Sequence, residues 1–316
     1  MEAGGGPAPP TPLRRRRLGL NPTPPSGARL GALRRAVLTW GAQNRRDLPW
    51  RHTRDPWAVL VSEVMLQQTQ AARVVAPYGR FMERFADPAS CADAGRGEVV
   101  RAWAGLGYNR RAVNLWRAAT TVVEHHGGRV PCDLTSLRSL PGVGAYTARA
   151  VLAFAFEVDT GVVDTNVARL LARAVAGRPL SAGGAQALAD ALVPPRRSWD
   201  FNQALFDLGA RHCTARGPEC GGCPLRRSCR WAGAGRPGPD PAAATALTGR
   251  PQGRFEGSDR QGRGRLVAEL RAGPLGPEDL ARAAGWVTDP DRARRLAGAL
   301  VAEGIAAWVD GDLVLG

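Results

Sequence analysis

The chain of 316 residues is 44% hydrophobic, which is enough for one large core and a second small domain. No run approaches the roughly 20 apolar residues of a membrane helix, and no apolar signal core follows the arginine run 14–17, so we expect a cytoplasmic protein that does not contact a membrane. The 43 basic residues exceed the 28 acidic ones and give a net charge of +15, which indicates a polyanionic partner such as nucleic acid.

Composition and periodicity divide the chain into four regions. Residues 1–26 are rich in Pro, Gly and Arg and are expected to be disordered, whereas residues 27–231 read as short helices with hardly any strand pattern, which predicts an all-α domain. Residues 232–262 form a Pro/Gly/Ala-rich linker. The helices expected in the all-α domain are 55–70, 97–104, 110–124, 147–155, 163–175, 184–192 and 201–212.

Residues 263–316 read as a small separate module. Helical patterns at 264–271, 276–284 and 289–303 precede two alternating segments, 305–309 and 313–315, joined by an Asp310-Gly311 turn. Three helices and a hairpin predict a winged-helix-like α+β module. Arginines on its third helix (Arg292, Arg294 and Arg295) suit either contacts to DNA phosphates or an ordinary solvated surface.

The first candidate for acid–base chemistry is Glu63, the one acid in the mostly apolar helix 55–70. Its neighbours one turn away include Leu60 and Leu66, which would desolvate the carboxyl group and raise its pKa. A second acid, Asp164, stands where the helix 163–175 begins, a position equally suited to a plain N-cap. Cleavage of a glycosidic bond needs such a pair, one acid to protonate the leaving group and one carboxylate to stabilise the sugar cation.

A turn for anion binding is predicted at residues 140–147, LPGVGAYT. Pro141 stops one helix, Gly142 and Gly144 permit a tight turn around Val143, and the next helix starts at once. Backbone N–H groups at such a turn suit a DNA phosphate, although an ordinary helix–turn–helix connection has the same pattern.

Four of the six cysteines lie within seventeen residues, with the spacing C-x6-C-x2-C-x5-C. Thiolates in so tight a loop suit an iron–sulfur cluster or a zinc ion, and ligand identity alone leaves both open. The four candidate ligands are Cys213, Cys220, Cys223 and Cys229.

Five motifs occur in the order found in A/G-specific adenine DNA glycosylases of the endonuclease III superfamily, which the chain resembles over about residues 30–231. They are SEVMLQQTQ (62–70), GLGYNRRAVNL (105–115), LPGVGAYTA (140–148), VVDTNVARLLAR (162–173) and the cysteine loop. The resemblance implies a two-lobed helix-hairpin-helix fold with a [4Fe–4S] cluster on the cysteine loop. It implies hydrolysis of the bond between sugar and adenine mispaired with 8-oxoguanine or guanine in duplex DNA, which leaves an abasic site.

The same resemblance assigns roles by motif position. Glu63 would protonate adenine and activate water, Asp164 would stabilise the sugar cation, and Tyr146 and Asn166 would orient both groups. Leu106 or Tyr108 would enter the duplex as a wedge, and the hairpin would hold a phosphate. The residues expected to contact the extruded adenine, the opposite base or the backbone are Trp50, Arg51, Leu66, Gln67, Gln68, Thr69, Leu106, Tyr108, Gly142, Val143 and Gly144.

Two departures qualify the resemblance. The chain contains no lysine, and Tyr146 stands where relatives with lyase activity have their Schiff-base lysine, so a monofunctional glycosylase is expected. Only about 54 residues follow the linker, where the family usually has a larger domain that recognises 8-oxoguanine, so preference for that base is open. We expect a monomer that needs no nucleotide cofactor. The alternatives are a glycosylase for thymine or uracil opposite guanine and a non-catalytic iron–sulfur DNA-binding protein.

Overall fold

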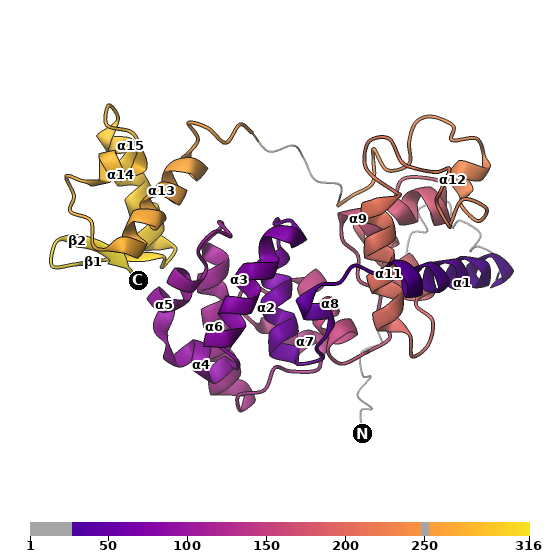
Figure 1. The fold of residues 1–316 in the computed structure, drawn as a ribbon, viewed down its shortest axis with the longest axis horizontal. Coiled ribbons are helices and arrows are strands. Elements are labelled where there is room, and N and C mark those ends of the chain that lie inside the picture. The colour runs from indigo at the N-terminus through magenta and orange to yellow at the C-terminus, as the bar shows by residue number, and fades with distance from the viewer. Residues whose placement is uncertain (1–26, 248–252) are drawn as a thin grey trace, which may run out of the picture.

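A computed structural model describes residues 27–247 and 253–316, so the disorder expected for residues 1–26 lies outside the described residues. Nearly all regular structure in the described part is helical (Figure 1). The elements before the linker are α1 (Gly27–Asn44), η1 (Pro49–Arg51), α2 (Pro56–Leu66), α3 (Ala71–Arg84), α4 (Pro88–Asp93), α5 (Gly95–Ala102), α6 (Arg110–His126), α7 (Leu134–Ser139), α8 (Ala145–Phe154), α9 (Thr165–Leu170), η2 (Leu171–Ala176), α10 (Ala182–Leu192), α11 (Ser198–Arg211) and α12 (Arg230–Gly233).

Two hydrophobic cores divide this all-α region into two lobes, as expected. The helical lobe, residues 48–162, is built from α2 to α8, and the cysteine lobe combines α1 with residues 163–247. The chain passes between them at Val162 and Val163, which belong to different cores. In the cysteine lobe α1 lies along α11, where a Cβ on Gly41 would come within 2.5 Å of the Ala204 Cβ, so only glycine allows this approach.

The expected linker is shorter in the structure than its composition indicates. Asp240 forms an ion pair with Arg173, Ala246 N–H donates to the carbonyl oxygen of Leu180 at 2.9 Å, and Thr245 is buried. The segment 237–247 is therefore part of the cysteine lobe, because its polar groups find partners there. Residues 248–252, which follow, lie outside the described residues.

The C-terminal module, residues 253–316, has the predicted three helices and hairpin: α13 (Asp259–Ala272), α14 (Leu280–Ala284), α15 (Pro290–Ala302), β1 (Ala306–Val309) and β2 (Asp312–Leu315). The two strands pair antiparallel with Ala306 opposite Leu315, and Leu275 bridges to Leu313 beside them. In Figure 1 this module lies beside α5, on the side of the helical lobe away from the cysteine lobe. No helix within residues 27–247 or 253–316 is long and apolar enough to cross a membrane.

Candidate active site and cysteine loop

Glu63 lies in the apolar helix α2, which Asp55 caps by accepting hydrogen bonds from Trp57 N–H and Ala58 N–H. The glutamate is only 4% exposed, and its Oε2 has no hydrogen-bond partner among the described residues. Burial raises the pKa of Glu63 to about 7, although the Tyr146 hydroxyl donates a hydrogen bond to the carboxylate. Near neutral pH a large fraction of Glu63 therefore carries a proton that it can donate.

Asp164 faces Glu63 from the cysteine lobe, at the N-cap of α9. Its Oδ1 accepts a hydrogen bond from Val167 N–H at 2.7 Å, and its Oδ2 accepts one from the Asn166 amide at 2.9 Å. Burial raises the pKa of Asp164, while these hydrogen bonds oppose the rise. The N-cap and catalytic interpretations of the sequence are thus compatible, because the Asp164 carboxylate caps α9 and also lies close enough to Glu63 to raise the pKa of Glu63.

Tyr146 and Asn166 each contact one of the two carboxyl groups, and their orienting roles in the reaction stay a prediction. Burial and the nearby carboxylates raise the pKa of Tyr146 well above its ordinary value, so the phenol stays neutral and acts as a donor. Asn166 donates to Asp164 and accepts from Arg169 Nη2 at 2.7 Å. The site therefore takes one acid from each lobe and a fixed donor beside each acid.

Arg51 is 6% exposed and forms a two-point ion pair with the buried Asp207, at 2.7 and 3.0 Å. This pairing holds the pKa of Asp207 below its usual range, and the Arg51 charge also acts against the raised pKa of Glu63. Trp50 is 7% exposed and packs edge-on against Tyr78. Arg51 therefore lies close enough to Glu63 to influence its pKa. The contact of Trp50 and Arg51 with an extruded adenine stays a prediction.

The predicted hairpin connects α7 to α8. Gly142 has a φ of +79°, and a Cβ there would meet the Asn114 Cβ at 2.7 Å, so both conformation and space require glycine. Gly144 precedes α8 in extended conformation, and no described side chain caps that helix. The N–H groups of its first turn therefore have no side-chain cap among the described residues, which leaves them available to an anion.

Two loops, one at residues 67–70 and one at 105–109, carry side chains that the resemblance assigns to contact with DNA. Gln68 and Tyr108 both adopt positive φ values, 55° and 47°, and both are exposed. Leu106, by contrast, is only 2% exposed and belongs to the core. Of the two residues expected to act as a wedge, Tyr108 is 42% exposed and Leu106 is buried, so Tyr108 is the one accessible from solvent; entry of either into a duplex stays a prediction.

Arg111 joins these two loops, a role that the sequence did not reveal. Its buried guanidinium donates to carbonyl oxygens from the end of α2 and from the loop 105–109, and it lies 5.5 Å from the ring of Tyr108. A cation suits the C-terminal end of α2, where carbonyl groups lack helical partners. The acceptors are the carbonyl oxygens of Val64, Met65, Gln67, Leu106 and Gly107 and the hydroxyl of Thr69.

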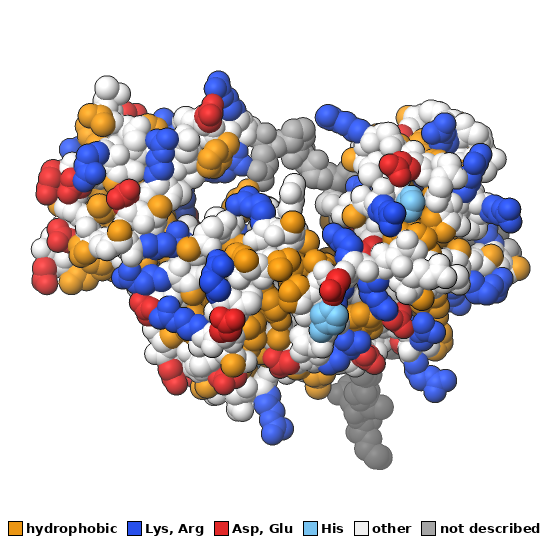
Figure 2. All heavy atoms as spheres, viewed as in Figure 1, with side chains coloured by type: hydrophobic (Ala, Val, Ile, Leu, Met, Phe, Trp, Pro, Cys, Tyr) orange, Lys and Arg blue, Asp and Glu red, His pale blue; other side chains and the backbone are white. Residues whose placement is uncertain are grey.

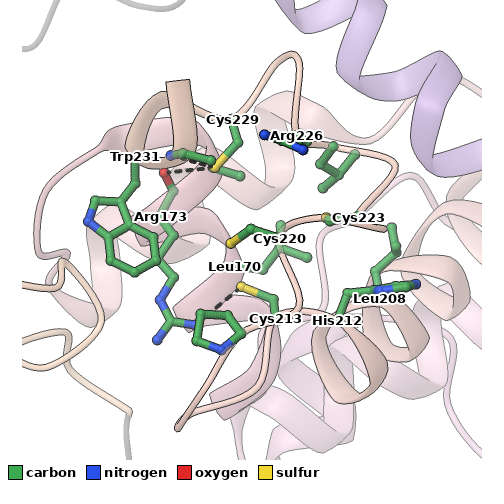
Figure 3. Close-up of a pocket in the computed structure, with 14 residues that line it drawn as sticks. Leu170, Arg173, Leu208, His212, Cys213, Cys220, Cys223, Arg226, Cys229 and Trp231 are labelled. Atoms are coloured by element: carbon green, nitrogen blue, oxygen red, sulfur yellow. Dashed lines mark hydrogen bonds between the residues drawn. The ribbon is translucent and has the colours of Figure 1, made fainter. Parts of the chain in front are cut away.

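The four cysteines of the loop line one cavity in the cysteine lobe, together with apolar side chains such as Leu170 and Leu208 (Figure 3). Burial raises the pKa of the thiols of Cys213, Cys223 and Cys229. Among residues 27–247 and 253–316 no group of three or more His, Cys, Asp or Glu side chains is arranged to hold a metal ion. The loop thus brings the four thiols to one cavity.

Arg173 lies against this cavity in the π-helical segment η2 and is only 2% exposed. Its guanidinium pairs with Asp240, donates to the carbonyl oxygen of Thr214 at 2.7 Å and reaches Cys213 Sγ at 3.5 Å (Figure 3). Other arginines of the loop, Arg216, Arg226 and Arg227, are exposed. The loop therefore has a buried cation that holds it and exposed cations that suit a phosphate backbone.

Comparison with known proteins places these features in a known family. Residues 61–194 match the model of the HhH-GPD superfamily base excision DNA repair protein. The adenine DNA glycosylase of Mycobacterium tuberculosis (strain ATCC 25618 / H37Rv) is 43% identical over 289 residues, which cover 88% of this chain and 92% of that protein. The adenine DNA glycosylase of Homo sapiens is 45% identical over 217 residues, 64% of this chain and 40% of that protein. The solved structure of a thermostable thymine-DNA glycosylase superposes with a TM-score of 0.61 at 31% identity, covering 66% of this chain and 98% of that one.

Proposed function

This chain belongs to the adenine DNA glycosylases, within the HhH-GPD superfamily of base excision DNA repair proteins, and we propose that the adenine it removes is mispaired with 8-oxoguanine or guanine in duplex DNA. It is an enzyme that cuts the N-glycosyl bond between adenine and its sugar. The observation that carries the proposal is the buried Glu63, with a pKa of about 7 and an unpartnered oxygen, facing Asp164 across the two lobes.

The proposed chemistry uses both carboxyl groups. Neutral Glu63 gives its proton to N7 of the extruded adenine, and the bond from C1′ to N9 breaks with its electron pair going to the base. Ionised Asp164 stabilises the resulting sugar cation, and a water molecule adds to C1′ and returns a proton to Glu63. The Tyr146 hydroxyl and the Asn166 amide hold the two carboxyl groups in place.

The reaction is proposed to stop at the abasic site. All 43 basic residues are arginine, so no lysine amine exists to attack C1′ and form a Schiff base. Tyr146 fills the corresponding place beside Glu63, and its neutral phenol serves as a hydrogen-bond donor. Strand cleavage then falls to another enzyme that accepts an abasic site.

Cys213, Cys220, Cys223 and Cys229 are proposed to hold a [4Fe–4S] cluster. The support for this proposal is that their soft thiol donors line one cavity and that the spacing C-x6-C-x2-C-x5-C resembles the cluster loop of the superfamily. When bound, such a cluster would pin the loop that carries Arg216, Arg226 and Arg227. We assign it no step of base release.

Duplex DNA is the proposed macromolecular partner, bound by a monomer without a nucleotide cofactor. The exposed arginines of the cysteine loop and the hairpin turn supply the contacts to the phosphate backbone (Figure 2). Chromosomal DNA as substrate would place the protein at the nucleoid in the bacterial cytoplasm.

A second candidate substrate is thymine opposite guanine, because the thymine-DNA glycosylase fold covers two thirds of this chain at 31% identity. Single-turnover release of free base distinguishes the two, with duplexes carrying adenine opposite 8-oxoguanine, guanine or thymine, and thymine opposite guanine. We expect release of adenine from the first two only. Glu63→Gln should release no base from any duplex yet bind all of them, while Glu83→Gln, an exposed acid on α3, should behave as wild type. Release of thymine, or full activity of Glu63→Gln, would overturn the proposal.

A further inference from the structure

We propose that Arg271 of the C-terminal module is a positioning residue for base release, because its guanidinium joins the two ends of the loop that carries Tyr108. The inference rests on the proposed function, since it takes the loop 105–109 to act during the release of adenine. The module lies beside α5, and α5 leads through this loop into α6 (Figure 1). Arg271 lies in the last turn of α13 and reaches the helical lobe from there.

The first end of the loop is the C-terminus of α5. The Val100 carbonyl oxygen accepts hydrogen bonds from Arg271 Nε at 3.3 Å and from Arg271 Nη2 at 3.2 Å. In a longer helix this carbonyl would accept from Ala104 N–H, but that group donates to the Arg101 carbonyl oxygen at 3.2 Å instead. Arg271 therefore takes the place of the missing helical donor and stabilises the point where α5 ends.

The second end of the loop is Asn109, the N-cap of α6. An asparagine at this position usually accepts a hydrogen bond from the first turn of its own helix. Here its side chain forms no such cap, and Asn109 Oδ1 accepts from Arg271 Nη2 at 3.1 Å. One nitrogen of the module therefore contacts both Val100 and Asn109, and this shared donor restrains the end of α5 relative to the start of α6.

The backbone between these two ends adopts a conformation that needs support. Tyr108 has a φ of 47°, in the left-handed region that a residue with a Cβ adopts where its surroundings enforce it. Arg111 supports the loop from within the helical lobe, since it donates to the Gly107 carbonyl oxygen at 3.1 Å. Arg271 adds a restraint at both ends of the loop. Its loss would let Tyr108 relax toward the more common backbone conformations.

The module is fixed well enough to act as this support. Arg101 Nη1 donates to the Arg271 carbonyl oxygen at 2.8 Å, so the two arginines exchange hydrogen bonds across the interface. A Cβ added to Gly97 of α5 would lie 3.0 Å from the Gly316 carbonyl oxygen, which shows how closely the end of β2 packs on α5. Apolar residues of the module and of the helical lobe also belong to one core. The module therefore acts on the loop without any contact of its own to DNA.

The test must distinguish this role from a contact that only holds the module on α5. Arg101→Met is the matched control, because it removes the reciprocal hydrogen bond of the same interface and leaves the Asn109 contact in place. The ion pair that this control also removes joins Arg101 to Glu98 within α5 itself. The two test variants are Arg271→Met and Asn109→Ala.

The first measurement is hydrogen exchange by mass spectrometry on the full chain without DNA. The peptide 104–113 contains amides that donate within the loop, such as Leu106 N–H to the Trp103 carbonyl oxygen at 3.3 Å. Arg271→Met and Asn109→Ala should each speed its exchange about tenfold. The double variant should exchange no faster than Arg271→Met, because both changes remove the same hydrogen bond. Peptides of α2 and α11 should exchange as in wild type, which shows that the fold is intact.

The second measurement is the single-turnover release of adenine from a bound duplex with adenine opposite 8-oxoguanine. Arg271→Met should lower this rate about tenfold, since a displaced loop places the substrate less accurately. Arg101→Met should match wild type in both measurements. Unchanged exchange of the loop, an equal effect of Arg101→Met, or faster exchange without slower release would overturn the inference. If wild type releases no adenine while the loop still responds to Arg271→Met, the proposed function fails and the hold of Arg271 on the loop stands.

Discussion

Arg169 donates a hydrogen bond to the carbonyl oxygen of Cys213, the first cysteine of the loop. The same guanidinium donates to Asn166 Oδ1 at 2.7 Å, and Asn166 donates in turn to Asp164. One buried side chain therefore connects the cysteine loop to the carboxylate that faces the sugar. A displacement of the loop would be transmitted to Asp164 through three hydrogen bonds.

Arg169→Met should separate the loop from the carboxylate. The substitution leaves the Asn166 oxygen and the Cys213 carbonyl without the Arg169 donor, which costs about 1–3 kcal/mol in hydrogen-bond free energy. Because Asn166 then no longer holds Asp164 in place, the activation barrier should rise by a similar amount, and single-turnover base release should fall about tenfold or more. Iron content and release rate are measured on the same preparation. A variant with unchanged iron content and an unchanged rate of base release would show that the hydrogen bonds of Arg169 do not couple the cysteine loop to Asp164. Arg178→Met is the control, because within the described part of the chain the exposed Arg178 donates just to the adjacent Pro179 carbonyl.

Arg111→Met should loosen the loops 67–70 and 105–109 at once. Its removal takes the Arg111 donor from the carbonyl oxygens of Met65 and Leu106 and frees the Tyr108 loop. We expect a loss of about 3 kcal/mol in the free energy of unfolding and at least tenfold weaker binding of a mispaired duplex. Urea unfolding and fluorescence anisotropy measure the two effects, with the exposed Arg80→Met as control. A small change in the free energy of unfolding together with an unchanged affinity for DNA would show that Arg111 holds neither loop in place.

The chemistry of the site could be predicted from the sequence because it resides in local signals. An isolated acid in an apolar helix singled out Glu63, and close spacing singled out the four cysteines, while their roles came from the family resemblance and stay predictions. The hairpin was predictable for the same reason, since glycine and proline determine turn conformation within a few residues. The structure places each of these where its pattern indicated.

Long-range partners could not be predicted. Arg111 and Arg169 resemble the many other arginines of the chain, and only their carbonyl acceptors, more than 40 residues away for Val64 and Cys213, distinguish them. Burial of Leu106 and packing of residues 237–247 likewise depend on tertiary neighbours. A Pro/Gly/Ala-rich composition predicts a linker because it has little to bury, yet one salt bridge from Asp240 to Arg173 anchors that segment.

Gly142→Ala should weaken DNA binding through the hairpin. A Cβ at a φ of +79° is strained, and it would also meet the Asn114 Cβ at 2.7 Å, so the turn must open. We expect about 1–3 kcal/mol of destabilisation and a loss of affinity for any duplex, matched or mispaired. Gly183→Ala is the matched control, since no described atom lies within 4 Å of a Cβ added there and α10 favours alanine. An unchanged affinity for Gly142→Ala would remove the hairpin from the DNA interface.

Base release should fall as the pH rises through about 7, because the pKa of Glu63 is about 7 and only its protonated form can donate to adenine. Above that pH the single-turnover rate should drop up to tenfold per pH unit. Measuring the single-turnover rate at each pH with the duplex already bound to the enzyme separates this effect from changes in DNA affinity. A rate that stays flat from pH 6 to pH 9 would show that another group supplies the proton.

The same pKa has a consequence for stability that Glu63→Gln exposes. Glu63 has a pKa of about 7 in the folded protein against 4.5 ordinarily, so its favourable contribution is complete below 4.5 and is lost as the pH rises through 7. Glutamine does not titrate. As the pH rises from 4.5 to 8, the free energy of unfolding of wild type should therefore fall by about 3 kcal/mol relative to that of Glu63→Gln. Urea unfolding of both proteins at four pH values measures this difference. If the gap between the two proteins is constant with pH, Glu63 ionises at its ordinary pKa and is not the acid of the reaction.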